Sequence, residues 1–159
     1  MLATILLGLS PLGFVTVPGL GEAITFLHLP MILAATLESP IAAALVGSTF
    51  GLMVGWKYPV PPMIYHIGTR ALAGLMAGLV FQAISRATSE GSKVTVASAA
   101  AAITATACNT LFMCITLLLL GLADPATLFS VALVHGAIEM AAALLLTTPL
   151  TIALKGRES

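Results

Sequence analysis

The sequence has little charge. Only 8% of its 159 residues are charged and 59% are hydrophobic, whereas a typical soluble domain is about 25% charged. This number of polar side chains is too small to cover the surface of a globular protein in water. The exterior of the folded chain is therefore expected to face lipid. Six basic and six acidic residues give a formal net charge of +0, which leaves no basic field to hold a nucleic-acid backbone. Nucleic acid is therefore excluded as a main partner.

Cysteine is scarce, and catalytic motifs are missing. Cys108 and Cys114 lie six residues apart in one apolar run, so they point to different faces of a helix and are expected to be free thiols. No GxSxG, HExxH, glycine-rich phosphate loop or CxxC motif occurs. His28, His135 and Glu139 offer a single i, i+4 pair, which is weak evidence for a metal site. We predict no enzymatic activity, no metal and no cofactor in this chain.

Apolar runs are what the chain has in abundance. A helix needs about 20 predominantly apolar residues to cross the hydrocarbon core of a bilayer. Charge, proline and glycine divide the sequence into six such runs: 1–17, about 22–37, 40–56, about 67–84, 94–122 and 126–154. The predicted fold is an all-α integral membrane protein, with residues 1–159 forming a single bundle of six transmembrane helices.

Several helix boundaries have local signals. Ser39 before Pro40 and Asp124 before Pro125 each combine a capping side chain with a first-turn proline, which predicts the starts of the third and sixth helices. The second helix is expected to bend at Pro30. The proline-rich segment 57–66 and the polar segment 85–93 are predicted to be loops.

Basic residues predict the orientation in the membrane. One side receives four of them, and the other receives two. The first set is Arg86, Lys93, Lys155 and Arg157, and the second is Lys57 and Arg70. The positive-inside rule therefore predicts that both termini are cytoplasmic and that the 57–66 loop is outside.

Small residues recur every fourth position in two of the runs. The third has Gly47, Gly51 and Gly55, and the fourth has Gly74 and Gly78. Such stripes allow helix backbones to approach closely in lipid, so they predict tight packing.

Five polar residues interrupt the apolar runs: His28, Arg70, Asn109, His135 and Glu139. A charged side chain at the bilayer centre costs at least about 2.5–3.5 kcal/mol, so each one requires a partner or a role. All five are expected at a similar depth, in the outer half or near the midplane. This convergence predicts a binding site for a polar solute.

Each of these residues also has a structural interpretation. His135 and Glu139 share a helix face and could satisfy one another as a buried pair. Arg70 could extend to the outer interface, and Asn109 could join two helices. Three aromatic residues could be interface anchors or could stack on a ligand: Trp56, Tyr58 and Tyr65.

Four segments form a recognisable series. They are AITFLHLPMILAA at 23–35, followed by Pro40 and the glycines; RALAGL at 70–75; Asn109-Thr110; and HGAIE at 135–139 with Thr148-Pro149. Their order and spacing resemble the substrate-binding S components of energy-coupling factor (ECF) vitamin transporters, and pantothenate-type S components most closely.

The resemblance implies a subunit of the bacterial plasma membrane that captures a vitamin or vitamin precursor with high affinity, under a lid formed by the loops after helices one and three. A membrane coupling subunit and two cytoplasmic ATPases would complete an ABC-type importer and use the ATP. Arg70, Asn109 and His135 would suit the carboxylate and polar groups of pantothenate, and Glu139 would accept from its hydroxyls. The small residues that dock helix one to the coupling subunit would be Thr4 and Gly8. The competing hypothesis is a structural or assembly subunit that binds no ligand.

Overall fold

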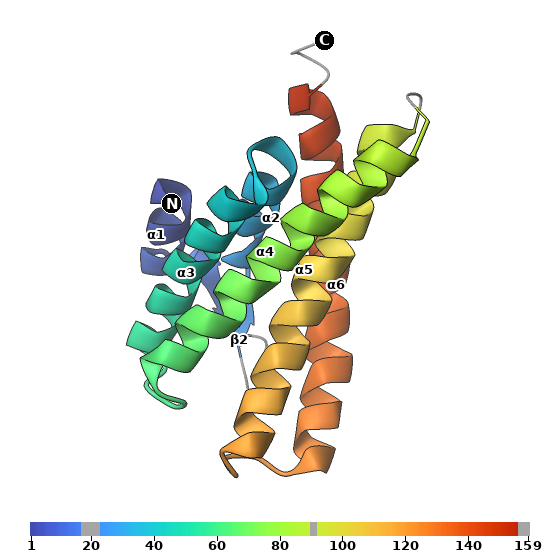
Figure 1. The fold of residues 1–159 in the computed structure, drawn as a ribbon. Helices are drawn as coiled ribbons and strands as arrows, with labels where there is room; N and C mark the ends of the chain where they lie inside the picture. Colours follow the sequence, from blue (N-terminus) through green and yellow to red (C-terminus); the bar gives the residue numbers. More distant parts are fainter. Residues whose placement is uncertain (17–22, 90–91, 156–159) are drawn as a thin grey trace.

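The computed structural model describes residues 1–16, 23–89 and 92–155. The described chain contains six α-helices and one small hairpin (Figure 1). In chain order these are α1 Leu2–Leu9, a 3₁₀ turn at Pro11–Gly13, β1 Phe14–Thr16, β2 Ala23–Thr25, α2 His28–Leu37, α3 Pro40–Lys57, α4 Met63–Ala87, α5 Lys93–Leu119 and α6 Pro125–Lys155. The predicted all-α fold with six helices is confirmed.

The helices differ greatly in length. In the described residues, α4, α5 and α6 are long and apolar enough to cross a membrane, with mean hydropathies of 1.5, 1.8 and 1.9. At 1.5 Å per residue, α1 and α2 reach only about 12 and 15 Å, or half the hydrocarbon core at most. Neither of these two helices crosses the bilayer alone.

The first predicted membrane-spanning helix, 1–17, is too long. α1 ends at Leu9, because the Ser10 hydroxyl bonds to the Leu7 carbonyl at 2.9 Å and Pro11 has no N–H to continue the helix. The chain then forms the antiparallel hairpin, in which Phe14 pairs with Thr25. α2 starts at His28, later than expected, so Pro30 lies in its first turn and the expected bend there is also wrong.

The two predicted proline-associated caps are confirmed. The Ser39 hydroxyl accepts from the Ala42 N–H at 3.1 Å at the start of α3. Asp124 Oδ1 accepts from the Ala126 and Thr127 N–H groups at 3.0 and 2.9 Å at the start of α6. The predicted 57–66 loop is too long, because α4 already begins at Met63, directly after the prolines.

Helices α3 and α4 pack backbone to backbone along the glycine stripes. A Cβ added at Gly47 or Gly51 would collide with the carbonyl oxygen of Arg70 or His66, respectively. On the α4 side, Gly74 and Gly78 meet the backbone of Ala43 and Pro40. Because glycine has no side chain, the backbone of α4 at Arg70 and His66 can lie directly against α3.

The small residues of α1 face the chain's own core. Thr4 is fully buried, and a Cβ at Gly8 would lie 2.7 Å from the Met53 side chain in α3. The burial of Thr4 favours a role in packing within the chain, whereas docking of a coupling subunit at the partly buried Gly8 stays a prediction.

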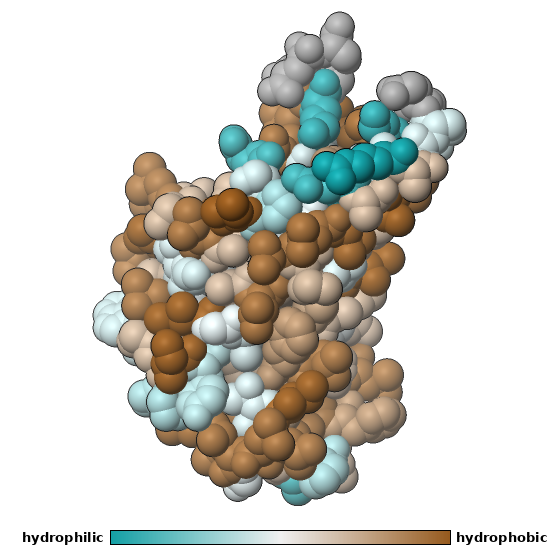
Figure 2. All heavy atoms as spheres, in the orientation of Figure 1, coloured by the Kyte–Doolittle hydropathy of each residue, from teal (hydrophilic) through white to brown (hydrophobic). Residues whose placement is uncertain are grey.

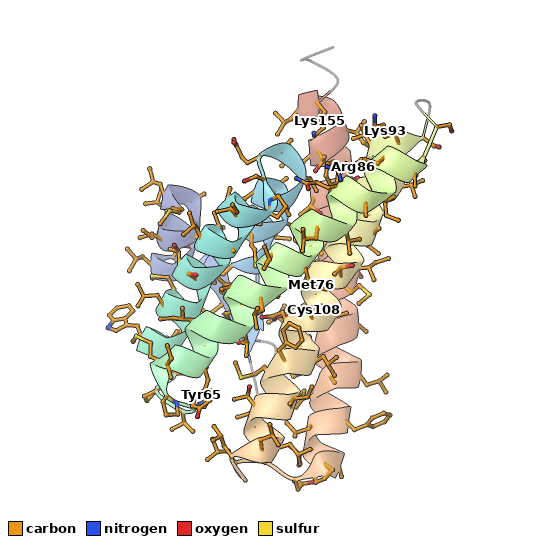
Figure 3. The ribbon with its side chains drawn as sticks, viewed as in Figure 1. Tyr65, Met76, Arg86, Lys93, Cys108 and Lys155 are labelled. Atoms are coloured by element: carbon orange, nitrogen blue, oxygen red, sulfur yellow. The ribbon has the colours of Figure 1, made fainter. Side chains whose placement is uncertain are left out.

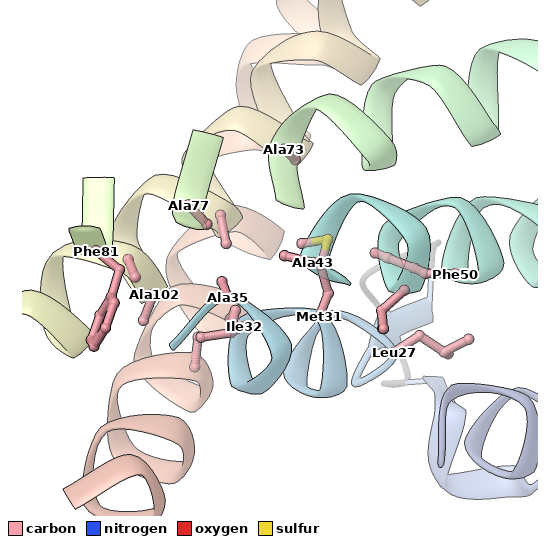
Figure 4. Close-up of a cluster of buried hydrophobic side chains, with 14 of the residues drawn as sticks. Leu27, Met31, Ile32, Ala35, Ala43, Phe50, Ala73, Ala77, Phe81 and Ala102 are labelled. Atoms are coloured by element: carbon pink, nitrogen blue, oxygen red, sulfur yellow. The ribbon is translucent and has the colours of Figure 1, made fainter. Parts of the chain in front are cut away.

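A compact apolar core surrounds α2. Leu27, Met31, Ile32 and Ala35 lie at its centre, against alanines and phenylalanines of α3, α4 and α5 (Figure 4). Outside, large apolar side chains are exposed, including Leu119 at 79% and Leu145 at 74%. Brown apolar surface covers most of the visible face, with hydrophilic residues gathered at one end (Figure 2). Such an exterior is stable only in lipid, which agrees with a membrane protein.

Candidate functional site

A cavity of about 170 Å³ lies between α4, α5, α6 and β2. Four of the five polar residues expected within the membrane line it: Arg70 from α4, Asn109 from α5, and His135 and Glu139 from α6. Apolar side chains such as Met113 form much of the remaining wall. The helices thus bring residues that are up to 69 positions apart in sequence to the wall of one partly open cavity.

Arg70 is buried in the protein. Its side chain is only 6% exposed, so the alternative in which it extends to the membrane interface is wrong. Its NH1 group lies 3.3 Å from each of His66 Nδ1, the His66 carbonyl and Thr69 Oγ1, and the guanidinium lies 4.8 Å from the Phe50 ring centroid. The Nε atom is buried with no hydrogen-bond partner in the described part of the chain. Arg70 is therefore anchored through one end of its guanidinium.

Glu139 is tied to the hairpin. Its Oε1 atom accepts from the Thr25 backbone N–H at 2.8 Å and from the Thr25 hydroxyl at 3.1 Å. Both of these bonds use the same oxygen, so Oε2 remains as an acceptor on a residue that lines the cavity. The cavity thus contains an anionic acceptor and, on another helix, a cationic donor.

Asn109 and His135 add polar atoms to the same space. Asn109 is buried, and its Oδ1 atom has no hydrogen-bond partner among the described residues. An amide that only joins two helices would have its oxygen satisfied by the neighbouring helix. His135 lies one turn from Glu139 on the cavity face of α6. A ligand that can donate a hydrogen bond would satisfy the Asn109 oxygen.

The other predicted site residues lie elsewhere. His28 is fully buried at the start of α2 and is not part of the cavity wall, so it is not gathered with His135 and Glu139. Trp56 is 68% exposed, and Tyr58 and Tyr65 are exposed near the α3–α4 connection; Figure 3 shows Tyr65 at that end. None of the three aromatic residues lines the cavity.

The α3–α4 connection nevertheless contacts the hairpin. The Lys57 ammonium lies 4.0 Å from the Phe14 ring centroid, and the Tyr58 ring meets Phe14 edge-on at 5.8 Å. β1 is therefore held by the end of α3, while β2 is held by Glu139. The hairpin connects these two regions beside the cavity.

Several residues around the site were not predicted from the sequence, among them two that contact its charged side chains. Thr25 reaches Glu139 only because the hairpin folds back, and no local pattern indicates that contact. The proline-rich segment predicts a loop at His66, but the residue lies in α4; its i, i+4 spacing from Arg70 is the signal that places both on one helix face.

Comparison with known proteins adds one result. Residues 1–151 match the family model for the substrate-specific component of ECF transporters, a range that includes every residue of the cavity wall. No curated protein matches the chain.

Proposed function

Because the chain belongs to the family of ECF transporter substrate-specific components, we propose that it is the high-affinity membrane subunit that captures a vitamin or vitamin precursor for import. Pantothenate is our best candidate. Family membership implies a small-molecule substrate and partner subunits of the ECF module. We propose that these partners are one membrane coupling subunit and two ATPases, which would supply the ATP chemistry.

The burial of Arg70 in a cavity with Asn109, His135 and Glu139 carries this proposal. A guanidinium in a water-poor site binds a carboxylate strongly. The Glu139 carboxylate and the Asn109 carbonyl would accept from hydroxyl and amide N–H groups. Pantothenate has one carboxylate, two hydroxyls and an amide, so its polar groups complement those of the wall.

The cavity size also favours a compact solute. Pockets for drug-sized ligands have volumes of about 300–1,000 Å³, and this cavity is smaller, at about 170 Å³. We propose that the hairpin is the lid and that its displacement enlarges the cavity when the ligand enters.

The proposed orientation has the cavity facing outward. Arg86, Lys93 and Lys155 gather at one end of the bundle (Figure 3), which the positive-inside rule assigns to the cytoplasm together with both termini; Arg157 lies outside the described residues. The cavity wall includes Ala123 and Thr127, beside the α5–α6 connection at the opposite end. A solute would therefore enter from outside the cell.

Thermal unfolding of the detergent-purified chain in a vitamin panel tests the proposal. A ligand that binds only the folded state stabilises it by about 2.7 kcal/mol at 100 times its Kd, so pantothenate should raise the unfolding temperature. Mass spectrometry of co-purifying small molecules provides an unbiased second measurement. If no vitamin shifts unfolding and none co-purifies, the alternative of a structural or assembly subunit without a ligand would be favoured.

A further inference from the structure

His66 and Arg70 form a buried pair on one face of α4. Arg70 NH1 lies 3.3 Å from His66 Nδ1. A guanidinium has donors but no acceptor, so the contact is a hydrogen bond only when Nδ1 accepts. That requires the neutral tautomer of His66 with its hydrogen on Nε2.

The surrounding fold leaves room for this pair. Gly51 allows the His66 backbone to approach α3, and a Cβ at Gly55 would lie 3.3 Å from Cδ2 of the His66 ring. The Arg70 guanidinium lies 4.8 Å from the centroid of the Phe50 ring. The arginine is thus confined by α3 on one side and by its own helix on the other.

Packing alone does not explain a histidine at this position. His66 is 4% exposed, and its Nε2 atom has no hydrogen bond of normal geometry in the part of the chain that the structure describes, although the backbone at Tyr58, Val60 and Pro61 lies close enough to interact with the ring. A leucine would fill similar space but would provide neither a donor toward that backbone nor the acceptor at Nδ1.

We propose that His66 is a positioning residue that holds Arg70 in the orientation required to bind the carboxylate of the ligand. This inference rests on the proposed function. NH1 is engaged inside α4 by His66 and Thr69, so the rest of the guanidinium remains for the ligand. Without the Nδ1 acceptor, the guanidinium would adopt several orientations, and a carboxylate would have to order it on binding.

Binding of two probes to the purified full chain tests this role. The probes are pantothenate and its neutral analogue, in which an alcohol replaces the carboxylate. Their Kd ratio measures carboxylate preference and is insensitive to a uniform loss of folded protein. His66→Leu should lower this preference about tenfold, equivalent to about 1.4 kcal/mol. His66→Asn should restore most of it, because Asn Oδ1 can accept near the position of Nδ1. An unchanged preference in His66→Leu would overturn the proposal.

A spectroscopic measurement tests the pair without a ligand. The ¹⁵N-histidine spectrum of the chain contains three imidazoles, and the resonances missing in His66→Asn identify His66. We expect an unprotonated, hydrogen-bonded Nδ1 that shifts in Arg70→Leu. A proton on Nδ1 in the unsubstituted chain would overturn the proposal even if pantothenate binds. If neither probe binds, pantothenate is not the ligand. The protonation of Nδ1 in the ¹⁵N spectrum then still tests whether His66 accepts a hydrogen bond from Arg70.

Discussion

Glu139 in α6 accepts two hydrogen bonds from Thr25 in β2, across 114 residues of sequence. The backbone N–H donates at 2.8 Å and the hydroxyl at 3.1 Å, both to Oε1. Glu139 also lines the cavity. The same carboxylate therefore anchors the hairpin and lines the cavity, so the proposed ligand would couple the position of the hairpin to the occupancy of the cavity.

Substitution of Glu139 should release β2. Glu139→Ala removes the oxygen that accepts both hydrogen bonds from Thr25, and we expect faster hydrogen exchange of the Thr25 amide than in the unsubstituted chain. Thr25→Val removes only the hydroxyl bond and should cost about 1.5 kcal/mol of folding stability, because the acceptor is charged. Exchange by mass spectrometry and chemical unfolding measure the two effects. Equal protection of the amide in Glu139→Ala would show that Glu139 does not hold β2.

Arg70 should contribute strongly to affinity. Arg70→Ala removes a charge-assisted contact to a carboxylate and is expected to weaken pantothenate binding by about 1.5–3 kcal/mol, measured by titration calorimetry. Arg86→Ala is the matched control, because it removes the same charge from the same helix at an exposed position. An unaltered Kd in Arg70→Ala would exclude Arg70 from the site.

Much of the architecture could be predicted from the sequence, because the bilayer imposes strong constraints. The apolar runs of α4, α5 and α6 predicted long helices, and Ser39 and Asp124 marked two helix starts through local hydrogen bonds. The cost of burying a charge in lipid selected Arg70 and Glu139 as residues that needed a role, and both line the cavity.

The hairpin and its contacts could not be predicted in the same way. Hydropathy shows that the first 17 residues are apolar, but it does not distinguish a spanning helix from a short helix followed by a strand. The contact of Thr25 with Glu139 depends on the register of that strand. The sequence allowed Trp56 to be either an anchor at the membrane interface or a residue that stacks on a ligand. Its exposed position outside the cavity favours the anchor.

The stripe on α3 should tolerate no added methyl group. A Cβ at Gly47 would collide with the Arg70 carbonyl oxygen and approach Met31 Sδ to 3.0 Å, so Gly47→Ala is expected to lose about 1–3 kcal/mol of stability. Gly68→Ala is the control, because nothing lies within 4 Å of its added Cβ. That variant should gain about 0.5–1 kcal/mol, since alanine favours the helix. Chemical unfolding of both variants in detergent measures the difference, and equal stabilities would contradict the close approach of α3 and α4.

The cap of α6 should make stability depend on acidity. A hydrogen bond from the Thr127 hydroxyl, followed by the Thr127 and Ala126 N–H groups, lowers the pKa of Asp124 from its usual 3.8. Because the folded pKa is the lower one, the stabilisation is complete above pH 3.8 and disappears as pH falls through the folded value. Asp124→Asn keeps the Oδ1 acceptor but does not titrate. Thermal unfolding of both proteins from neutral to acid pH should therefore show a larger acid-dependent loss in the unsubstituted chain. Other carboxyl groups cancel in the comparison, and parallel curves would show that Asp124 is not the titrating cap.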